Sequence, residues 1–470
     1  MAQVDLKTQQ LPAEALEGLR AGLHGKLSLP GDPGYDEART IWNAMIDRKP
    51  AIIVRAADAA DVVSAVQFAR EHQVLLAVRG GGHNIAGNAV CDGGLMLDLS
   101  TMKSVQVDEK ARTAKVQPGA LLADFDREAQ AFGLATPLGI NSTTGVAGFT
   151  LGGGFGWISR KFGLTVDNLI SVDIVTADGK QVHASEKENP DLFWAVRGGG
   201  GNFGVVTSFE YRLHPVGPEV IAGLIVHPFA QAGELLEGYR RFVATAPDEV
   251  TAWVVLRKAP PLPFLPPEVH GKEILVFAVC AVGDKAKAEK AVAPLRALGK
   301  PIADVIGPSP FAGWQTAFDP LLTPGARNYW KSHDFTKLDD GFIQVLLDAV
   351  KTLPTPECEI FLGQLGGAIN RVKADATAYP HRDVEFIMNI HTRWRDAAED
   401  AKCIAWTRKV FEAATPFATG GVYVNFMPED EGQRVPKGAY GPNYERLAKL
   451  KAKFDPANLF RMNQNIKPTA

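Results

Sequence analysis

Clusters of glycine constrain this chain more than any other feature of its sequence. Residues 80–204 hold 22 of its 46 glycines, gathered mainly at 80–82, 139–156 and 198–204. No three-residue period runs through them, which excludes a collagen-like helix. The neighbouring segments are rich in Val, Ile, Leu and Phe, which excludes a disordered linker. Because glycine lets a backbone come unusually close to another backbone or to a ligand, this region is predicted to hold something tightly.

The overall composition is that of an ordinary globular protein. Of the 470 residues, 46% are hydrophobic and 22% are charged, and the net charge of −3 gives no reason to expect nucleic acid or an anionic membrane as a partner. The four cysteines are far apart and form no C-x-x-C pair, so neither a disulfide framework nor a metal site is indicated. The first thirty residues lack the apolar segment of a secretory signal, and no run of about eighteen apolar residues occurs. A cytoplasmic location is therefore expected.

Apolar periodicity predicts an α+β fold. Residues 1–50 look helical and polar, and Asp58 is expected to cap a helix. The dipeptide Asp178-Gly179 is a strong hairpin signal. The strands expected in this part of the chain are 51–54, 74–78, 95–99, 105–107, 113–116, 172–176, 180–183 and 205–213.

The segment Pro215-Val216-Gly217-Pro218 predicts a domain boundary. After it, strands alternate with helices such as 285–293, which indicates a sheet covered by helices on one face. A last helix is expected at 443–454, ended by Asp455-Pro456. The strands expected in this second part are 220–226, 251–256, 274–282, 359–362 and 384–391.

Three glycine clusters are more than tight turns alone require. Runs of backbone N–H groups without side chains form concave anion sites, and the pyrophosphate of a dinucleotide is a usual occupant. Gly199-x-Gly201-x-x-Gly204 matches the Rossmann fingerprint, but a strand and not a helix is expected after it, so that interpretation is rejected. The chain contains no P-loop, no G-x-S-x-G elbow and no H-E-x-x-H pair, which leaves a nucleotidase or hydrolase poorly supported.

Several motifs, in this order and spacing, carry a family resemblance. They are Arg79-Gly80-Gly81-Gly82-His83, Thr144-Gly145-Val146-Ala147-Gly148 through Gly156, Asp191-Leu192-Phe193-Trp194-Ala195-Val196-Arg197-Gly198-Gly199-Gly200, Tyr423-Val424-Asn425-Phe426 and Asp455-Pro456-Ala457-Asn458-Leu459-Phe460-Arg461-Met462-Asn463-Gln464-Asn465-Ile466. With them the chain resembles, nearly end to end, the flavin-linked oxidases of the vanillyl-alcohol-oxidase/PCMH superfamily, in the branch named after berberine bridge enzyme.

The resemblance implies a two-part FAD-binding domain with a substrate domain inserted in it. The PCMH-type part would span 1–217, the substrate domain 218–420, and the returning segment 421–470. It also implies that His83 is joined covalently to the flavin. The residues expected to contact FAD are Arg79, Gly80, Gly81, Gly82, His83, Asn84, Gly87, Pro137, Gly139, Asn141, Ser142, Thr143, Thr144, Gly145, Gly148, Gly152, Gly153, Gly156, Val206, Tyr423, Asn425, Asn463 and Asn465.

Two positions depart from the family's pattern. Many relatives hold the flavin a second time through a cysteine where this chain has Asn141, so a single covalent link through His83 is expected. Many also place a tyrosine base after the Tyr-x-Asn start of a late strand, and here that position is Phe426. Phenylalanine cannot accept a proton, whereas a neutral amine substrate could donate a hydride without that base. Tyr423 is a candidate pocket residue, or an ordinary core tyrosine.

Strand parity supplies the remaining candidates for substrate contact. Glu385, Asn389 and His391 share one face of the predicted strand at 383–392 with Ile387, whereas Phe386, Met388 and Ile390 share the other. The polar face either looks toward the flavin or is simply exposed. Lys331 lies in a stretch that resembles a pocket segment of bacterial relatives, and its alternative is a solvated lysine.

The function expected is an FAD-dependent oxidase acting on a small molecule that bears an amine or a hydroxyl, with O2 reoxidising the flavin to give H2O2. Two alternatives stay open: a dehydrogenase that uses another electron acceptor, and a flavin-binding scaffold without turnover.

Overall fold

The computed structural model describes residues 12–469, and its first half contains two separate sheets. Three parallel strands, β2, β4 and β3, form the first sheet with an antiparallel β1 at its edge. The second sheet is antiparallel, in the order β5-β6-β10-β8-β9. The strands are β1 (Lys26–Ser28), β2 (Ile52–Arg55), β3 (Leu76–Arg79), β4 (Leu95–Asp98), β5 (Val105–Asp108), β6 (Thr113–Val116), β8 (Leu169–Val175), β9 (Gln181–Ser185) and β10 (Val205–Arg212), with a short pair β7 (Leu134–Ala135) and β11 (His214–Pro215).

Helices cover both of these sheets. They are α1 (Ala13–Gly22), α2 (Tyr35–Arg39), α3 (Ala59–Glu71), α4 (Leu122–Gln130), α5 (Val146–Leu151), α6 (Ser159–Phe162) and α7 (Pro190–Val196). Asp58 caps α3 as expected, because its carboxylate accepts bonds from the N–H groups of Ala60 and Asp61. The hairpin β8–β9 also forms as predicted, with Gly179 at φ +78° in its turn.

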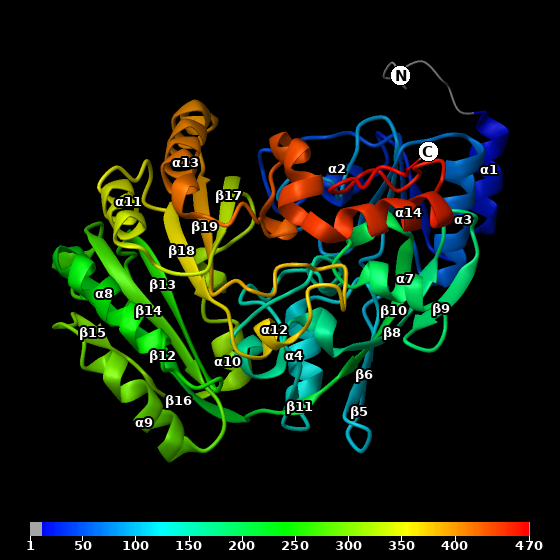
Figure 1. Cartoon of the computed structure of the whole chain (residues 1–470). Helices are drawn as coiled ribbons and strands as arrows, with labels where there is room; N and C mark the ends of the chain where they lie inside the picture. Colours follow the sequence, from blue (N-terminus) through cyan, green and yellow to red (C-terminus); the bar gives the residue numbers. More distant parts are fainter. Residues whose placement is uncertain (1–11, 470) are drawn as a thin grey trace.

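The middle of the chain forms one antiparallel sheet with its helices on a single face. The strand order is β15-β12-β14-β13-β18-β19-β17, and β16 also pairs with β12. The strands are β12 (Glu219–Pro228), β13 (Val250–Lys258), β14 (Glu273–Ala281), β15 (Ala303–Asp304), β16 (Gly307–Pro310), β17 (Arg327–Phe335), β18 (Glu359–Gln364) and β19 (Phe386–Trp394). Four helices, α8 (Ala232–Val243), α9 (Lys285–Arg296), α11 (Asp340–Val350) and α13 (Asp400–Ala414), pack on its outer face (Figure 1). The short helices α10 (Phe311–Gln315) and α12 (Ala368–Arg371) lie in connections.

The chain then returns to its first half. The last helix, α14 (Tyr444–Phe454), lies beside α7 (Figure 1), and Val422, Val424 and Ile466 join the same apolar core as residues of β6, α4 and α7. The inner face of the middle sheet is thereby left facing the glycine loops.

Three local predictions were wrong. Residues 12–50 are not simply helical, since they contain β1 between two short helices; residues 1–11 lie outside the described part. Tyr423 begins a 3-10 turn at Val424–Phe426 and not a strand, because the Asn425 side chain bonds back to the Tyr423 hydroxyl. The strand β17 was missed because it reads as polar, although eight of its nine residues are buried.

Candidate functional site

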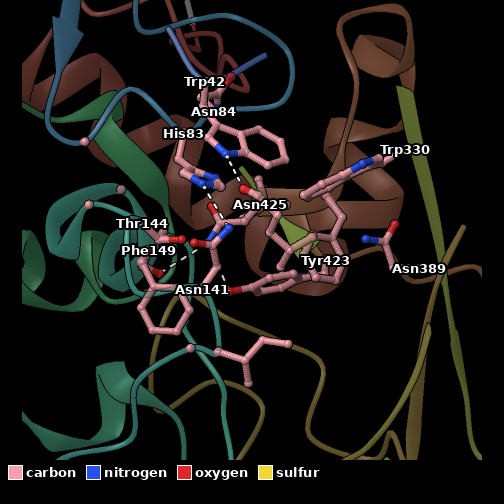
Figure 2. Close-up of a pocket in the computed structure, with 18 of the residues that line it drawn as sticks. Trp42, His83, Asn84, Asn141, Thr144, Phe149, Trp330, Asn389, Tyr423 and Asn425 are labelled. Atoms are coloured by element: carbon pink, nitrogen blue, oxygen red, sulfur yellow. Dashed lines mark hydrogen bonds between the residues drawn. The ribbon is translucent and has the colours of Figure 1, made fainter. Parts of the chain in front are cut away.

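A cavity of about 370 Å³ separates the glycine loops from the middle sheet. Its size lies within the range of small-molecule and cofactor sites. On the loop side its wall is largely bare backbone, and Figure 2 shows His83 and Asn141 there with Trp330 and Asn389 on the opposite side. The predicted cofactor residues that line it are Gly80, Gly81, Gly82, His83, Asn84, Gly139, Asn141, Thr144, Gly145, Gly148, Val206, Tyr423, Asn425 and Asn463.

Two of the glycine loops touch through their backbones. A Cβ atom on Gly81 would lie 2.4 Å from the backbone nitrogen of Gly145, and a Cβ on Gly145 would lie 2.3 Å from that of Gly81. Neither position can carry a side chain without separating the loops. The sequence prediction that these glycines serve close backbone approach is confirmed here, and the same approach leaves their N–H groups at a wall of the cavity.

His83 is held against this wall by aromatic and polar neighbours. Its ring stacks on Trp42, with ring centroids 4.2 Å apart and planes at 24°. Its Nε2 lies 3.3 Å from the Asn141 side-chain nitrogen and 3.5 Å from the Thr143 hydroxyl (Figure 2). Burial lowers the pKa of His83 to about 3, so the imidazole is neutral at pH 7. A neutral imidazole keeps a free lone pair on one ring nitrogen, so His83 is in the protonation state that a nucleophile needs.

Several predicted cofactor residues do not line the cavity and instead build the loops. Gly152, Gly153 and Gly156 serve packing, because a Cβ on them would meet Asn425, Tyr379 and the Leu138 carbonyl. The others are tied to neighbouring chain. The Arg79 guanidinium donates to the Ala38 carbonyl, the Gly87 carbonyl accepts from Arg48, the Pro137 carbonyl accepts from Thr165, Ser142 bonds to Asp319, and Thr143 bonds to Asn141. Asn465 also lies outside the lining.

The opposite wall is the inner face of the middle sheet. Alternate residues of each strand reach it, as strand parity requires. Most are apolar: Leu224, Val226, Trp253, Val255, Ile274, Val276, Ala278, Trp330 and Phe361. The cross-strand register aligns three of the exceptions in one row, since Arg257 pairs with Glu359 and Glu359 pairs with His391, which in turn pairs with Trp330; Asn389 lies outside this row.

The row contains a connected set of charged and polar groups. Glu359 Oε2 accepts a bond of 2.6 Å from Arg257, and its Oε1 lies 3.0 Å from His391 Nδ1. Burial by itself raises the pKa of Glu359, but Arg257 and His391 lower it to about 2. Burial lowers the pKa of His391 below its ordinary value against the opposing effect of Glu359. At pH 7 the row therefore holds a guanidinium, a carboxylate and a neutral imidazole.

The alternation of side chains along the strand correctly predicted that two of the three candidates face the cavity. Asn389 and His391 line the cavity, while Phe386, Met388 and Ile390 pack under the helices. Glu385 does not line it. That residue precedes β19, and its carboxylate accepts from Asn370 at the end of the sheet.

Lys331 also lies outside the lining. It pairs with Ile390, on the helix-covered face, and its ammonium bonds to Glu431 and lies 4.3 Å from the centre of the Phe411 ring. Its neighbour Trp330 points into the cavity instead, because successive strand residues alternate.

Tyr423 lines the cavity, but its hydroxyl is occupied. It accepts the N–H of Gly154 at 3.1 Å and the side-chain N–H of Asn425 at 3.0 Å. Burial raises its pKa to about 12, so it stays protonated at pH 7. Phe426 lies beside it in the cavity wall, edge-on to Trp330. Neither residue is a ready proton acceptor.

The backbone and side-chain polar groups on the loop side of the cavity fit a dinucleotide. Glycine backbone replaces side chains along the wall, as close contact with phosphates requires. The side-chain oxygen of Asn463 is buried and has no hydrogen-bond partner among residues 12–469, so it can accept a bond from a ligand. Within the same residues no cysteine lines the cavity.

Sequence reasoning missed Trp42, Arg257 and Glu359. No motif marks them: Trp42 comes from a loop before β2 and stacks on His83, whereas Arg257 and Glu359 reach the cavity through the cross-strand register. The group His24, Asp58 and Asp61 lies close enough to hold a metal ion, but the Asp61 carboxylate already accepts backbone bonds from His24, Gly25 and Ala57. Among residues 12–469, no helix is long and apolar enough to cross a membrane.

Comparisons with known proteins agree with this geometry. A model described as an FAD binding domain matches residues 50–185, and one described as berberine and berberine like matches residues 422–467. An FAD-linked oxidoreductase of Dictyostelium discoideum is 33% identical over 432 residues, which cover 91% of each chain. The (R)-6-hydroxynicotine oxidase of Paenarthrobacter nicotinovorans is 30% identical, with 95% of this chain and 97% of that protein covered.

The fold itself is shared with solved structures. A crystal structure of 6-hydroxy-D-nicotine oxidase from Arthrobacter nicotinovorans superposes with a TM-score of 0.86 at 28% identity, covering 95% of this chain and 98% of that one. A chitooligosaccharide oxidase superposes with a TM-score of 0.85 at 27% identity, covering 97% and 100%.

Proposed function

Because this chain belongs to the berberine-bridge-enzyme-like family of FAD-linked oxidoreductases, we propose that it is an oxidase that removes a hydride from a small molecule bearing an amine or a hydroxyl. Bound FAD supplies the two-electron chemistry, and O2 takes the electrons to give H2O2. The observation that carries the proposal is the single cavity with a glycine-backbone wall on one side and a ring-lined sheet face on the other.

The flavin is held, in this proposal, by one covalent bond to His83. The neutral imidazole, stacked on Trp42 at the cavity wall, is placed to bond to the cofactor. Asn141 stands beside it where many relatives have a cysteine, and the four cysteines of the chain are buried elsewhere. A second protein–flavin bond would have no thiol to form it.

The cavity also bears on the substrate. Its sheet wall is mostly aliphatic and aromatic, with one polar row, which suits a small, ring-sized molecule better than an oligosaccharide with many hydroxyls. Among the relatives, this favours comparison with the nicotine oxidase over the chitooligosaccharide oxidase.

Three measurements test the proposal. Acid-precipitated protein should retain its flavin, and mass spectrometry should find it on the peptide containing His83. Anaerobic mixing with a panel of amines and alcohols should bleach the flavin. Aerobic turnover should then produce one H2O2 per substrate oxidised. Reduction of an artificial dye without peroxide would indicate a dehydrogenase, and a flavin that no substrate reduces would indicate a scaffold.

A further inference from the structure

The imidazole of His391 is held at the cavity wall in one protonation state by its neighbours. A carboxylate can only accept hydrogen bonds, so the 3.0 Å contact with Glu359 fixes the His391 proton on Nδ1. The lone pair is thereby left on Nε2. Glu359 cannot turn away, because its other oxygen is bonded to Arg257 and both side chains are largely buried.

The Nε2 atom of His391 needs a partner that the protein does not supply. His391 is 6% exposed, and its Nε2 is buried without a hydrogen-bond partner among residues 12–469. Leaving such an acceptor unsatisfied costs about 1–3 kcal/mol. The ring lies at the cavity wall, edge to face with Trp330 at 4.4 Å between centroids. A ligand that carries an O–H or N–H donor would satisfy it.

The charges around this atom discriminate between donors. Glu359 is the one acidic residue in the described cavity lining, and both its oxygens are already used. Arg257 and Arg393 add positive charge near the imidazole, and the His83 ring across the cavity is neutral. A cationic amine would therefore find no free carboxylate, whereas an uncharged hydroxyl can exchange its hydrogen bond to water for one to Nε2.

Apart from Asn389, the rest of this wall is apolar. Val255 and Phe361 lie on the same strands as the row, and Val226, Ile274 and Val276 lie on the neighbouring strands β12 and β14. Such a surface recognises a substrate by shape and apolar area, and a few polar groups, His391 and Asn389 among them, orient it.

We infer that the substrate is a largely apolar primary or secondary alcohol and that His391 Nε2 accepts its hydroxyl proton during oxidation. The O–H bond breaks with the proton going to Nε2, the carbinol C–H bond breaks with its electron pair leaving as hydride to the flavin, and a carbonyl forms. The proton on His391 is returned when O2 is reduced to H2O2. This inference rests on the proposed function and names the substrate class of the same cavity.

The test compares the flavin-loaded protein with its His391→Gln variant, using benzyl and cinnamyl alcohol and the matched benzylamine as probes. We expect at least one alcohol to bleach the wild-type flavin anaerobically, and the variant to do so about 100-fold more slowly, in the range of general base catalysis. His333→Gln serves as control, because His333 is buried on the other face of the same sheet, where it bonds to the Phe411 carbonyl. It should retain the wild-type rate.

A binding measurement makes the test independent of turnover. 4-Bromophenol cannot be oxidised at a carbinol carbon but can donate its O–H to Nε2. Its dissociation constant, measured by calorimetry, should rise about tenfold in His391→Gln, in line with the loss of about one hydrogen bond. Nitrogen NMR of histidine-labelled holoprotein should show the Nδ1–H tautomer of His391 and a shift of the Nε2 signal on adding the phenol.

The Glu359→Gln variant tests whether Glu359 positions His391. The reaction needs neutral His391, so the rate should fall as pH drops through the pKa of that imidazole. Removing the carboxylate takes away the interaction that raises this pKa, so the acid limb should move to lower pH. In His391→Gln the limb should disappear.

The inference would be overturned by a flavin-loaded protein that oxidises benzylamine but no alcohol, or by a His391→Gln variant with wild-type alcohol rates and phenol affinity. Protein without flavin, or with flavin that no probe reduces, would instead overturn the proposed function. The flavin content and melting temperature of each variant separate these results from misfolding.

Discussion

Replacing Gly81 with alanine should force apart the two loops that form the glycine wall. The added Cβ would lie 2.4 Å from the Gly145 nitrogen, and an ordinary contact begins near 3.4 Å, so the loops must separate by about 1 Å. Both atoms belong to backbone, and the Gly145 loop is further fixed by a 2.9 Å bond from the Val146 N–H to the Ala120 carbonyl. Relief by side-chain rotation is therefore not available.

Overpacking of this kind costs about 1–3 kcal/mol. Because the strain lies in the cofactor wall, we expect Gly81→Ala to lower the melting temperature by several degrees and to reduce the flavin bound per protein at least tenfold. The flavin-to-protein absorbance ratio after desalting, together with calorimetry, measures both. Gly18→Ala is the control, since nothing lies within 4 Å of a Cβ there and it sits in α1.

The double variant Gly81→Ala/Gly145→Ala provides a second test of the close approach. Gly145→Ala should cost a similar amount, because its Cβ would lie 2.3 Å from the Gly81 nitrogen. Once one substitution has separated the loops, the second should cost less, so the two effects should be clearly less than additive. Full flavin loading and an unchanged melting temperature in Gly81→Ala would refute the close-approach argument.

Three further predictions concern groups that the structure places in or away from the cavity. Tyr423→Phe leaves the Gly154 N–H without its acceptor and should lower stability by about 1–3 kcal/mol in denaturant titrations; an unchanged midpoint would contradict the buried bond. Lys331→Met removes one of the two cations paired with the buried Glu431 carboxylate, the other being Arg434, and should destabilise the fold by about 1–3 kcal/mol, with substrate kinetics unchanged; altered kinetics at normal stability would show that Lys331 acts at the site. Burial raises the pKa of Asp126 to about 7, so the folded state holds a proton that the unfolded state releases near pH 4, and stability falls between these values as pH rises; in Asp126→Asn the melting temperature should lose this dependence between pH 5 and 8.

The local elements were largely predictable, and the exceptions have physical causes. The Asp58 cap and the hairpin at Asp178-Gly179 depend on neighbouring residues alone, and both formed as expected. Strand β17 escaped detection because its polar residues are buried by pairing with other segments: Lys331 with Glu431, for example. The late strand expected at Tyr423 is a 3-10 turn for a similar reason, since Asn425 bonds across it.

The sequence by itself located the cofactor side of the molecule. Glycine at positions such as Gly81 and Gly145 is required by local backbone contact, and His83 follows one of these loops, so motif and spacing sufficed to predict the wall. Parity further placed His391 on the correct face of its strand.

The arrangement of polar residues on the sheet side of the cavity was decided only by the tertiary structure. Arg257, Glu359 and His391 are separated by about a hundred and by thirty-two residues along the chain, and the register of β13, β18 and β19 alone makes them neighbours. Lys331 and Glu385 are charged like Arg257 and Glu359, but they do not line the cavity. Lys331 lies on the helix-covered face of the sheet, and Glu385 precedes strand β19. Side-chain type says what a residue can do, whereas cross-strand register determines which residues act together.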